Sequence, residues 1–395
     1  MRRTSIRLVA LLAISSSVLA ATGCEQLEGR NNTRKGNRLF RASRFVDAVV
    51  AYEQALEQVD SPTIHYNLGL TYTKLARPGS DKPVRIGIKG TEACNVISGT
   101  GSEDARVCVK VSETEDRRFE DCDDKNVCAA SYACKQVTLC TMDAATIADH
   151  ATSHFLVWIK AQESDDAIAP KLKAAEDALA AAREEGDPKA LDRAEKDVDN
   201  YRAKDDTRTL MTEQWLSSEQ FDKAIGYWTG LLAERPKDTG IMGNLAGIAN
   251  KAGDWRASIE WYNKVADTSA DDDSKVAAYQ AVGYVAFARL KSGALTQAES
   301  IEAADRGIAA LQKGAALAPK NGRLWGLQGS LFLYRSQAEG ASFAWLIDRA
   351  SGQDLQRVAN VLAKEAKKAQ EGGASTTPPA TTPTPPASPA PKAGG

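Results

Sequence analysis

The chain has little of what catalysis and nucleic-acid binding usually require. Its 395 residues include only three histidines, and the net charge is −2, from 50 Lys and Arg against 52 Asp and Glu. Without a basic excess there is no positive field to hold a phosphate backbone, so nucleic acid is not an expected partner. The sequence also has no Gly-x-Ser-x-Gly elbow, no phosphate-binding loop ending in Gly-Lys and no dinucleotide fingerprint. We therefore expect a non-enzymatic protein with no cofactor and no small-molecule ligand.

Aromatic residues are scarce too, at 6% of the chain, beside 43% hydrophobic and 26% charged residues. This composition, which is rich in alanine, is typical of an extended helical protein. The tryptophans include Trp215, Trp228, Trp261 and Trp325. They fall largely at positions expected to pack between helices, so we interpret them as core residues and not as a ligand cage. Stacked helices bury their core between neighbours, so chain length sets no limit on such a fold.

A long apolar run occurs at the N-terminus. Basic residues in Met1–Arg3 precede the run Leu8–Ala21, and a small-residue segment then leads to Cys24. The run is shorter than the roughly 20 residues of a spanning helix, and the order resembles a bacterial lipoprotein signal peptide, which is removed. The resemblance implies that Cys24 is lipidated, palmitate included, and anchors the chain in a membrane. A plain secretory signal with an incidental cysteine is the alternative. Because Glu25 and not Asp follows, we expect the periplasmic side of the outer membrane rather than the inner membrane.

Two stretches of the chain repeat one pattern of small and large residues. The first has Gly36, Leu39, Ala48, Tyr52 and Ala55, and the second has Thr212, Trp215, Ala224, Trp228, Leu231 and Pro236. A small residue lets two helices cross closely, and large residues three and four positions away fill the groove beside the crossing. The pattern predicts helix-turn-helix pairs and resembles the tetratricopeptide repeat (TPR) family. This resemblance implies an all-α, TPR-like α-solenoid.

Further units match the same family, so that the resemblance covers roughly half the chain in two blocks. Asn67-Leu68-Gly69 with Tyr72, and Trp325 with Gly329 and Phe332, carry the first-helix pattern. The predicted organisation is a signal peptide (1–23), the first repeat with the first helix of the second (24–77), a cysteine-rich insertion (78–141), the resumed repeat helix (142–168), a helical hairpin (169–206), a C-terminal repeat block (207–340), capping helices (341–371) and a disordered Pro/Thr/Ala tail (372–395).

Six cysteines interrupt the helical pattern between Leu75 and Met142. They are Cys94, Cys108, Cys122, Cys128, Cys134 and Cys140. An exported chain meets an oxidising compartment, so this even number predicts three disulfides, and the fifteen possible pairings stay open. Alternating residues at Val84–Ile88 and Val107–Val111 predict two strands with a turn at Gly99–Ser102 between them. We expect a small, partly β module.

The same cysteines allow a second interpretation, in which the insertion binds a metal or exchanges disulfides and the repeats only position it. Five residues separate successive members of the last four cysteines, whereas structural zinc sites prefer two to four, and no Cys-x-x-Cys pair is present. His150 and His154 lie one helical turn apart, but the intervening residues lack the glutamate of a metallopeptidase. We expect structural disulfides, no metal, and packing or surface roles for these histidines.

Two other segments fall outside the repeats. Ala169–Asp206 is rich in Ala, Lys, Glu and Asp and is broken at Gly186-Asp187-Pro188, which predicts an antiparallel helical hairpin. Residues 372–395 are almost wholly Pro, Thr, Ala, Ser and Gly, a composition that cannot bury enough apolar surface to offset its ordering entropy. We interpret this tail as a solvated linker, with a proline-rich ligand for another protein or a tether through the cell wall as the alternatives.

The TPR resemblance places the functional surface on the concave face formed by the first helix of each repeat, where such proteins hold a peptide or a helix. Candidate groove residues are Arg34, Asn37, Arg41, Asn67, Lys74, Asn244, Asn250 and Lys251. In members that grip a peptide's terminal carboxylate, two asparagines act with several basic residues. Asn37 and Asn67 match the asparagines, but Asp206 and Leu210 stand where basic residues belong. We expect a lipid-anchored scaffold that binds other envelope proteins or their peptide segments and helps to assemble or stabilise an outer-membrane or periplasmic complex.

Overall fold

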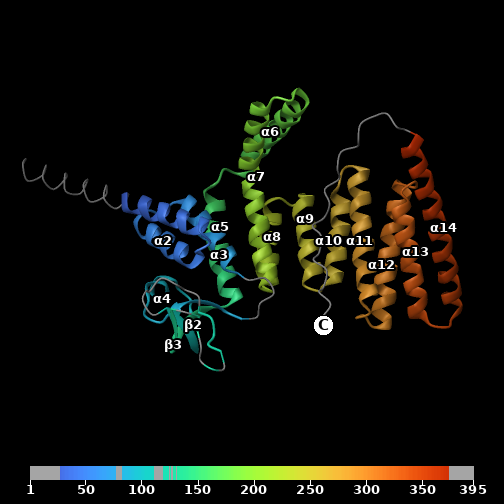
Figure 1. Cartoon of the computed structure of the whole chain (residues 1–395). Helices are drawn as coiled ribbons and strands as arrows, with labels where there is room; N and C mark the ends of the chain where they lie inside the picture. Colours follow the sequence, from blue (N-terminus) through green and yellow to red (C-terminus); the bar gives the residue numbers. More distant parts are fainter. Residues whose placement is uncertain are drawn as a thin grey trace, which may run out of the picture. The chain divides into compact units, whose positions relative to one another are not determined.

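The computed structural model describes residues 27–76, 82–110, 119–123, 125, 128–129 and 131–372 (Figure 1). The chain divides into two compact units, Met1–Tyr227 and Trp228–Gly395. The predicted signal peptide, the lipidation site Cys24 and the tail beyond Gly372 lie outside the described residues. Within the described ranges, no helix is both long and apolar enough to cross a bilayer.

The first unit begins with two helix pairs. The first pair is a helix of residues 27–41, called the first helix below, and α2 (Phe45–Gln58). The second pair is α3 (Pro62–Leu75) and α5 (Ala144–Ala161), which are separated in the sequence by the cysteine-rich insertion. These two helices contact each other although the insertion separates them in the sequence.

One packing rule holds both pairs together. A methyl group added at Gly36 would lie 2.5 Å from a ring carbon of Tyr52, and one added at Gly69 would lie 2.5 Å from a ring carbon of Phe155. In each pair a glycine on the first helix thus admits the fully enclosed aromatic ring of the second. This is the packing that the small-and-large pattern of the sequence predicts for a TPR-like fold.

The insertion is a three-stranded antiparallel sheet with a short helix. Its elements are β1 (Val84–Ile88), α4 (Glu92–Val96), β2 (Gly101–Lys110) and β3 (Tyr132–Met142), and the strand order is β1-β3-β2. All six cysteines are paired, as Cys94–Cys140, Cys108–Cys128 and Cys122–Cys134. The predicted disulfides are confirmed, and the structure selects one of the fifteen pairings.

The predicted turn at Gly99–Ser102 is wrong in part. Gly101 and Ser102 already belong to β2, where they pair with Thr141 and Cys140 of β3. The strands that the sequence showed, β1 and β2, do not pair with each other, because β3 lies between them. The sequence analysis had not identified β3.

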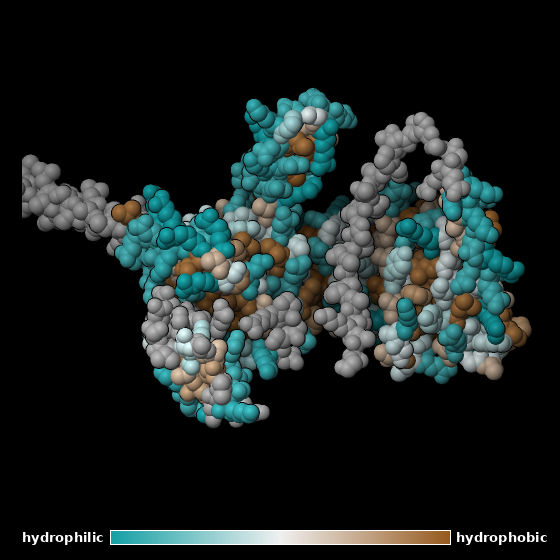
Figure 2. All heavy atoms as spheres, viewed as in Figure 1, coloured by the Kyte–Doolittle hydropathy of each residue, from teal (hydrophilic) through white to brown (hydrophobic). Residues whose placement is uncertain are grey.

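The helical hairpin follows the insertion and runs into the next repeat. It consists of α6 (Asp165–Glu185) and α7 (Pro188–Ser217), and α6 ends at Gly186, whose φ of 70° suits glycine. Figure 2 shows a mostly hydrophilic surface over this hairpin. The continuous helix α7 supplies one arm of the hairpin, and beyond residue 206 its Trp215 contacts the ring of Tyr227 in the first half of α8 (Phe221–Glu234). The predicted boundary at residue 206 therefore falls inside a single helix.

The second unit continues as a series of antiparallel helices. They are α9 (Thr239–Lys251), α10 (Trp255–Thr268), α11 (Asp272–Ser292), α12 (Gln297–Leu317), α13 (Gly322–Glu339) and α14 (Phe343–Gly372), and each packs on the next. A methyl group at Gly283 would lie 2.8 Å from Leu311, so the glycine rule extends to the pair α11–α12. One helix, α14, occupies the segment for which the sequence predicts capping helices. The fold is all-α and TPR-like, with a small disulfide-rich β insertion.

Candidate peptide-binding groove

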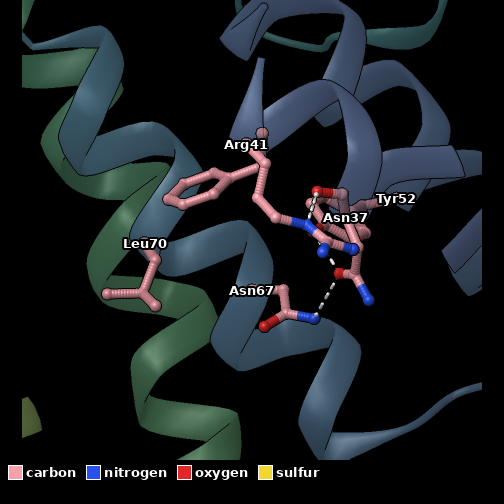
Figure 3. Close-up of a pocket in the computed structure, with 6 residues that line it drawn as sticks. Asn37, Arg41, Tyr52, Asn67 and Leu70 are labelled. Carbon is pink, nitrogen blue, oxygen red and sulfur yellow. Dashed lines mark hydrogen bonds between the residues drawn. The ribbon is translucent and has the colours of Figure 1, made fainter. Parts of the chain in front are cut away.

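The first helix and α3 enclose a small hollow between them. It has a volume of about 220 Å³ and is lined by Asn37, Phe40, Arg41, Tyr52, Asn67 and Leu70. Figure 3 shows Arg41 and Asn67 reaching from the two helices toward Asn37. Three residues that the sequence analysis placed in the groove, Asn37, Arg41 and Asn67, therefore meet at one point.

A hydrogen-bond network fixes these side chains. The Tyr52 hydroxyl donates to Asn37 Oδ1 at 2.6 Å, and Asn67 Nδ2 donates to the same oxygen at 3.3 Å. Arg41 Nε donates to the backbone oxygen of Asn37 at 3.2 Å. Burial raises the pKa of Tyr52 to about 12, although the charge of Arg41 acts in the opposite direction. The phenol therefore stays protonated at neutral pH and remains a donor to Asn37.

The network leaves polar groups for a ligand. The two bonds occupy Asn37 Oδ1 and the amide nitrogen of Asn67. Among the contacts of the described residues, the amide hydrogens of Asn37 and the oxygen Asn67 Oδ1 have no hydrogen-bond partner. One asparagine thus offers donors and the other an acceptor. A peptide unit presents the complementary pair, a carbonyl oxygen and an N–H group.

A second hollow lies along the same pair of helices. Its volume is about 480 Å³, and its lining residues are Gly29, Arg30, Thr33, Arg34, Val59, Ser61, Thr63 and Ile64. These residues come from the beginning of the first helix, from the corner after α2 and from the beginning of α3. Arg34, another predicted groove residue, lies here. The two hollows together define the groove, which we call the α3 groove.

The remaining predicted residues lie elsewhere. Lys74, in the last turn of α3, lines neither hollow. Asn244, Asn250 and Lys251 belong to α9 in the second unit. Asn250 has a structural role, because Arg289 Nη2 donates to its backbone oxygen at 2.7 Å.

Several groove residues were missed. Tyr52 had been interpreted as core only, although its hydroxyl reaches the groove. Arg30 stands one helical turn before Arg34, and this spacing could have revealed it. Phe40 and Leu70 form an apolar side of the first hollow, and no motif in the sequence distinguishes them.

All three histidines of the chain meet beside the groove, between α2, α3 and α5. His65 Nε2 lies 2.9 Å from Asp60 Oδ1, and His65 Nδ1 lies 2.8 Å from His154 Nδ1. Since a carboxylate only accepts, His65 Nε2 donates to Asp60, and His65 Nδ1 then accepts a hydrogen bond from His154 Nδ1. The ring of Tyr72 stacks on His150 at 4.8 Å and on His154 at 5.8 Å. This arrangement is structural, in agreement with the packing role expected for His150 and His154.

Glu53 completes the histidine cluster. Burial raises the pKa of this carboxyl group, but the hydrogen bond and positive charge of His154 and the hydrogen bond from the Tyr72 hydroxyl outweigh burial, so its pKa lies below the ordinary value. Tyr72 is the counterpart, since burial and then the charge of Glu53 raise its pKa far above the ordinary value. Glu53 therefore ties α2 to α3 and α5 as a carboxylate.

In the part of the chain that the structure describes, metal-ligating side chains do not gather at the groove. Among the described residues, the cluster with suitable side chains is Cys108, Cys122 and Cys128, whose sulfur atoms lie within 4.8 Å of one another. All three belong to disulfides. A thiolate, which is the form that binds metal, would exist here only after reduction.

No protein-family model matches the chain, and no curated protein does. Among solved structures, the chain is similar to the crystal structure of the TPR domain of P58(IPK), with 11% sequence identity over 86% of this chain and 99% of that one, and with a TM-score of 0.18. At this TM-score the similarity carries no argument, so the TPR-like fold rests on the helix pairs themselves.

Proposed function

We propose that this chain is a non-enzymatic scaffold that holds a peptide segment of another protein in the α3 groove. The meeting of Asn37, Arg41 and Asn67 over a hollow of about 220 Å³ carries this proposal. The groove presents side-chain donors and an acceptor, and the histidines His65 and His154 beside it are engaged with Asp60 and Glu53. These features support binding over catalysis.

The proposed location is the cell envelope. In this proposal Cys24 is lipidated after removal of residues 1–23, and the acyl chains hold the protein on the periplasmic side of the outer membrane. Burial of acyl chains contributes about 0.8 kcal/mol per CH₂, so several chains on one residue anchor stably. The three disulfides support an oxidising compartment. Incorporation of labelled palmitate, and its loss in Cys24→Ala, would test the anchor.

Site-specific photo-crosslinking in living cells tests the scaffold function. A photoreactive residue at Leu70, inside the groove, should capture a defined envelope protein that mass spectrometry can identify. The matched control carries the same residue at Tyr284, which is 50% exposed on α11. If Leu70 captures nothing beyond what Tyr284 captures, the groove is not a binding surface.

A second variant separates the repeats from the insertion. Replacing Val84–Cys140 by a short linker should leave capture at Leu70 unchanged if the groove alone binds. If capture disappears while circular dichroism shows intact helices, the insertion contributes the binding surface.

One observation favours a second candidate function, metal binding or thiol exchange by the insertion. Cys122 lies beside the disulfide Cys108–Cys128, so a thiolate at Cys122 would be close enough to attack it. Titration of free thiols and metal analysis of the purified protein decide this point. Six oxidised cysteines and no metal would reject this candidate.

A further inference from the structure

Three arginines line the α3 groove in a single row. Arg30, Arg34 and Arg41 lie on the first helix with spacings of four and seven residues, which follows the helical repeat, so they share one face with Asn37. Arg30 and Arg34 line the larger hollow, and Arg41 lines the smaller one. All three side chains are exposed.

No carboxylate neutralises this row. Among the described residues, neither Arg30 nor Arg34 nor Arg41 forms an ion pair, whereas Arg44 at the end of the same segment is paired with Asp47 at 2.8 Å. From residue 29 to residue 46 the sequence contains no Asp or Glu, and α3 contains none. Asp60, near the beginning of α3, is bonded to His65. Both walls of the groove are therefore cationic or neutral, and an anionic ligand would relieve the repulsion between the arginines.

The dimensions point to an extended chain. Arg30 and Arg41 are eleven residues apart on a helix, which corresponds to about 16 Å at about 1.5 Å per residue. An extended peptide covers about 3.3 Å per residue, so about five residues match the row. The hollows are spaced along this length and can receive alternate side chains.

We propose that the occupant of the groove is an extended acidic segment of about five residues within a partner protein. Its Asp or Glu side chains pair with Arg30, Arg34 and Arg41, and its backbone bonds to the amides of Asn37 and Asn67. This inference rests on the proposed scaffold function and specifies its partner. The recognised groups are side-chain carboxylates and not a chain terminus. Binding of a terminal carboxylate would require basic residues at two positions that Asp206 and Leu210 occupy.

The polar groups of the site favour a peptide over a membrane surface. Beside the arginines, Asn37 and Asn67 offer amide donors and an acceptor, which a peptide backbone satisfies together, whereas a lipid phosphate only accepts. Arg41 is also held back by its bond to the Asn37 backbone oxygen. An extended chain can lie in such a groove and reach all three guanidinium groups.

Fluorescence polarisation with the full chain in detergent tests the proposal. The probe is a short labelled peptide with a run of Glu and Asp and an amidated C-terminus, and the neutral probe has Gln and Asn in their place. The acidic probe should bind and the neutral one should not, and binding should weaken as salt screens the charges. Arg30→Gln, Arg34→Gln and Arg41→Gln should each weaken binding about two- to fivefold, as exposed ion pairs do, and about tenfold or more together.

The matched control removes the same charge elsewhere. Lys291→Gln, Lys364→Gln and Lys368→Gln lie on exposed positions of α11 and α14, and this triple variant should bind the acidic probe like the unaltered chain. Equal binding of both probes, or unchanged binding by the arginine variant with intact circular dichroism, would overturn the proposal. A third outcome would also overturn the proposal. If the unaltered chain binds phosphatidylglycerol vesicles but neither peptide, and the arginine variant loses the vesicle binding, the row of arginines contacts lipid.

Crosslinking from Leu70 separates this inference from the scaffold function. If the captured segment is acidic and the arginine variant no longer captures it, both stand. If a partner is captured equally by the arginine variant, the acidic segment is wrong and the scaffold function remains. If neither form captures a partner, the scaffold function itself fails.

Discussion

Gly69→Ala tests the packing that joins α3 to α5 across the insertion. The added methyl group would lie 2.5 and 2.6 Å from two ring carbons of Phe155, where carbon atoms normally stay about 3.5 to 4.0 Å apart. Phe155 is fully buried and packs against the ring of Tyr66 at 6.1 Å, so the ring has little room to retreat. The two helices must therefore separate by about 1 Å or the ring must leave its rotamer.

The magnitude follows from two opposing effects. Overpacking of this kind costs about 1 to 3 kcal/mol, whereas replacing glycine by alanine inside a helix gains about 1 kcal/mol. The net expectation for Gly69→Ala is therefore a destabilisation of up to about 2 kcal/mol. Gly247→Ala on α9 is the matched control, because nothing lies within 4 Å of its added methyl group. It should stabilise its helix by up to about 1 kcal/mol.

Native-state hydrogen exchange is the suitable measurement, because two compact units need not unfold in a single transition. Amides of α3 and α5 should exchange faster in Gly69→Ala, and those of α9 should exchange more slowly in Gly247→Ala. A double-mutant cycle with Phe155→Leu should show coupling, since the smaller side chain relieves the clash. If Gly69→Ala is stabilised as Gly247→Ala is, the close crossing of α3 and α5 does not exist.

Three further predictions concern the insertion, the histidine cluster and the last helix. Replacing Cys94 and Cys140 by serine opens a loop of sequence separation 46, and the insertion should lose about 4 kcal/mol of stability in the chain-entropy account, measurable as faster proteolysis of the insertion. The pKa of Glu53 is lowered in the folded state, so its contribution to the free energy of unfolding is present above the ordinary carboxyl pKa and is lost as pH falls through the folded pKa. Glu53→Gln should therefore flatten the decrease of the urea midpoint below pH 4.5. Arg335→Met removes the partner that lies 2.5 Å from the buried carboxylate of Asp348, and it should destabilise the α13–α14 pair by about 3 kcal/mol or more. Denaturant unfolding, followed through the exchange of α14 amides, measures this loss. Wild-type behaviour in any of these three assays would refute the corresponding contact.

The repeats could be predicted from the sequence because one local rule governs them. The sequence shows Gly36 and Tyr52 in one unit and Gly69 in the next. The structure places Gly36 against Tyr52 and Gly69 against Phe155, a residue that the sequence analysis had not named. The rule depends on residue size and helical spacing, which the sequence displays directly. It holds even where the insertion separates the two helices of a pair.

The insertion could not be predicted in the same way. Strand β3 alternates poorly, since both faces of Tyr132–Cys134 are partly buried beside disulfides and only its last residues are buried together. The burial of successive residues along β3 therefore does not follow a period of two, which is the pattern that reveals a strand in a sequence. Pairing among six cysteines likewise depends on the sheet register, which spacing does not determine.

The hairpin boundary failed for a different reason. A helix normally ends at glycine or proline, and between Pro188 at its first position and Ser217 at its end, α7 contains neither. The change from hairpin to repeat is a change of packing partner along one uninterrupted helix. Arg208 marks this change, because its side chain is only 5% exposed and pairs with Asp165 of α6.

The groove connects the packing rule to function. Because Gly36 has no side chain, the ring of Tyr52 can lie against the first helix, and its hydroxyl then reaches Asn37 at 2.6 Å. That bond orients the Asn37 amide, and Asn67 completes the orientation from α3. The residue that appears in the sequence as core packing therefore also sets the polarity of the groove. Helical spacing predicts which side chains face the groove, but which atoms remain for a ligand follows only from the bonds that the core has already used.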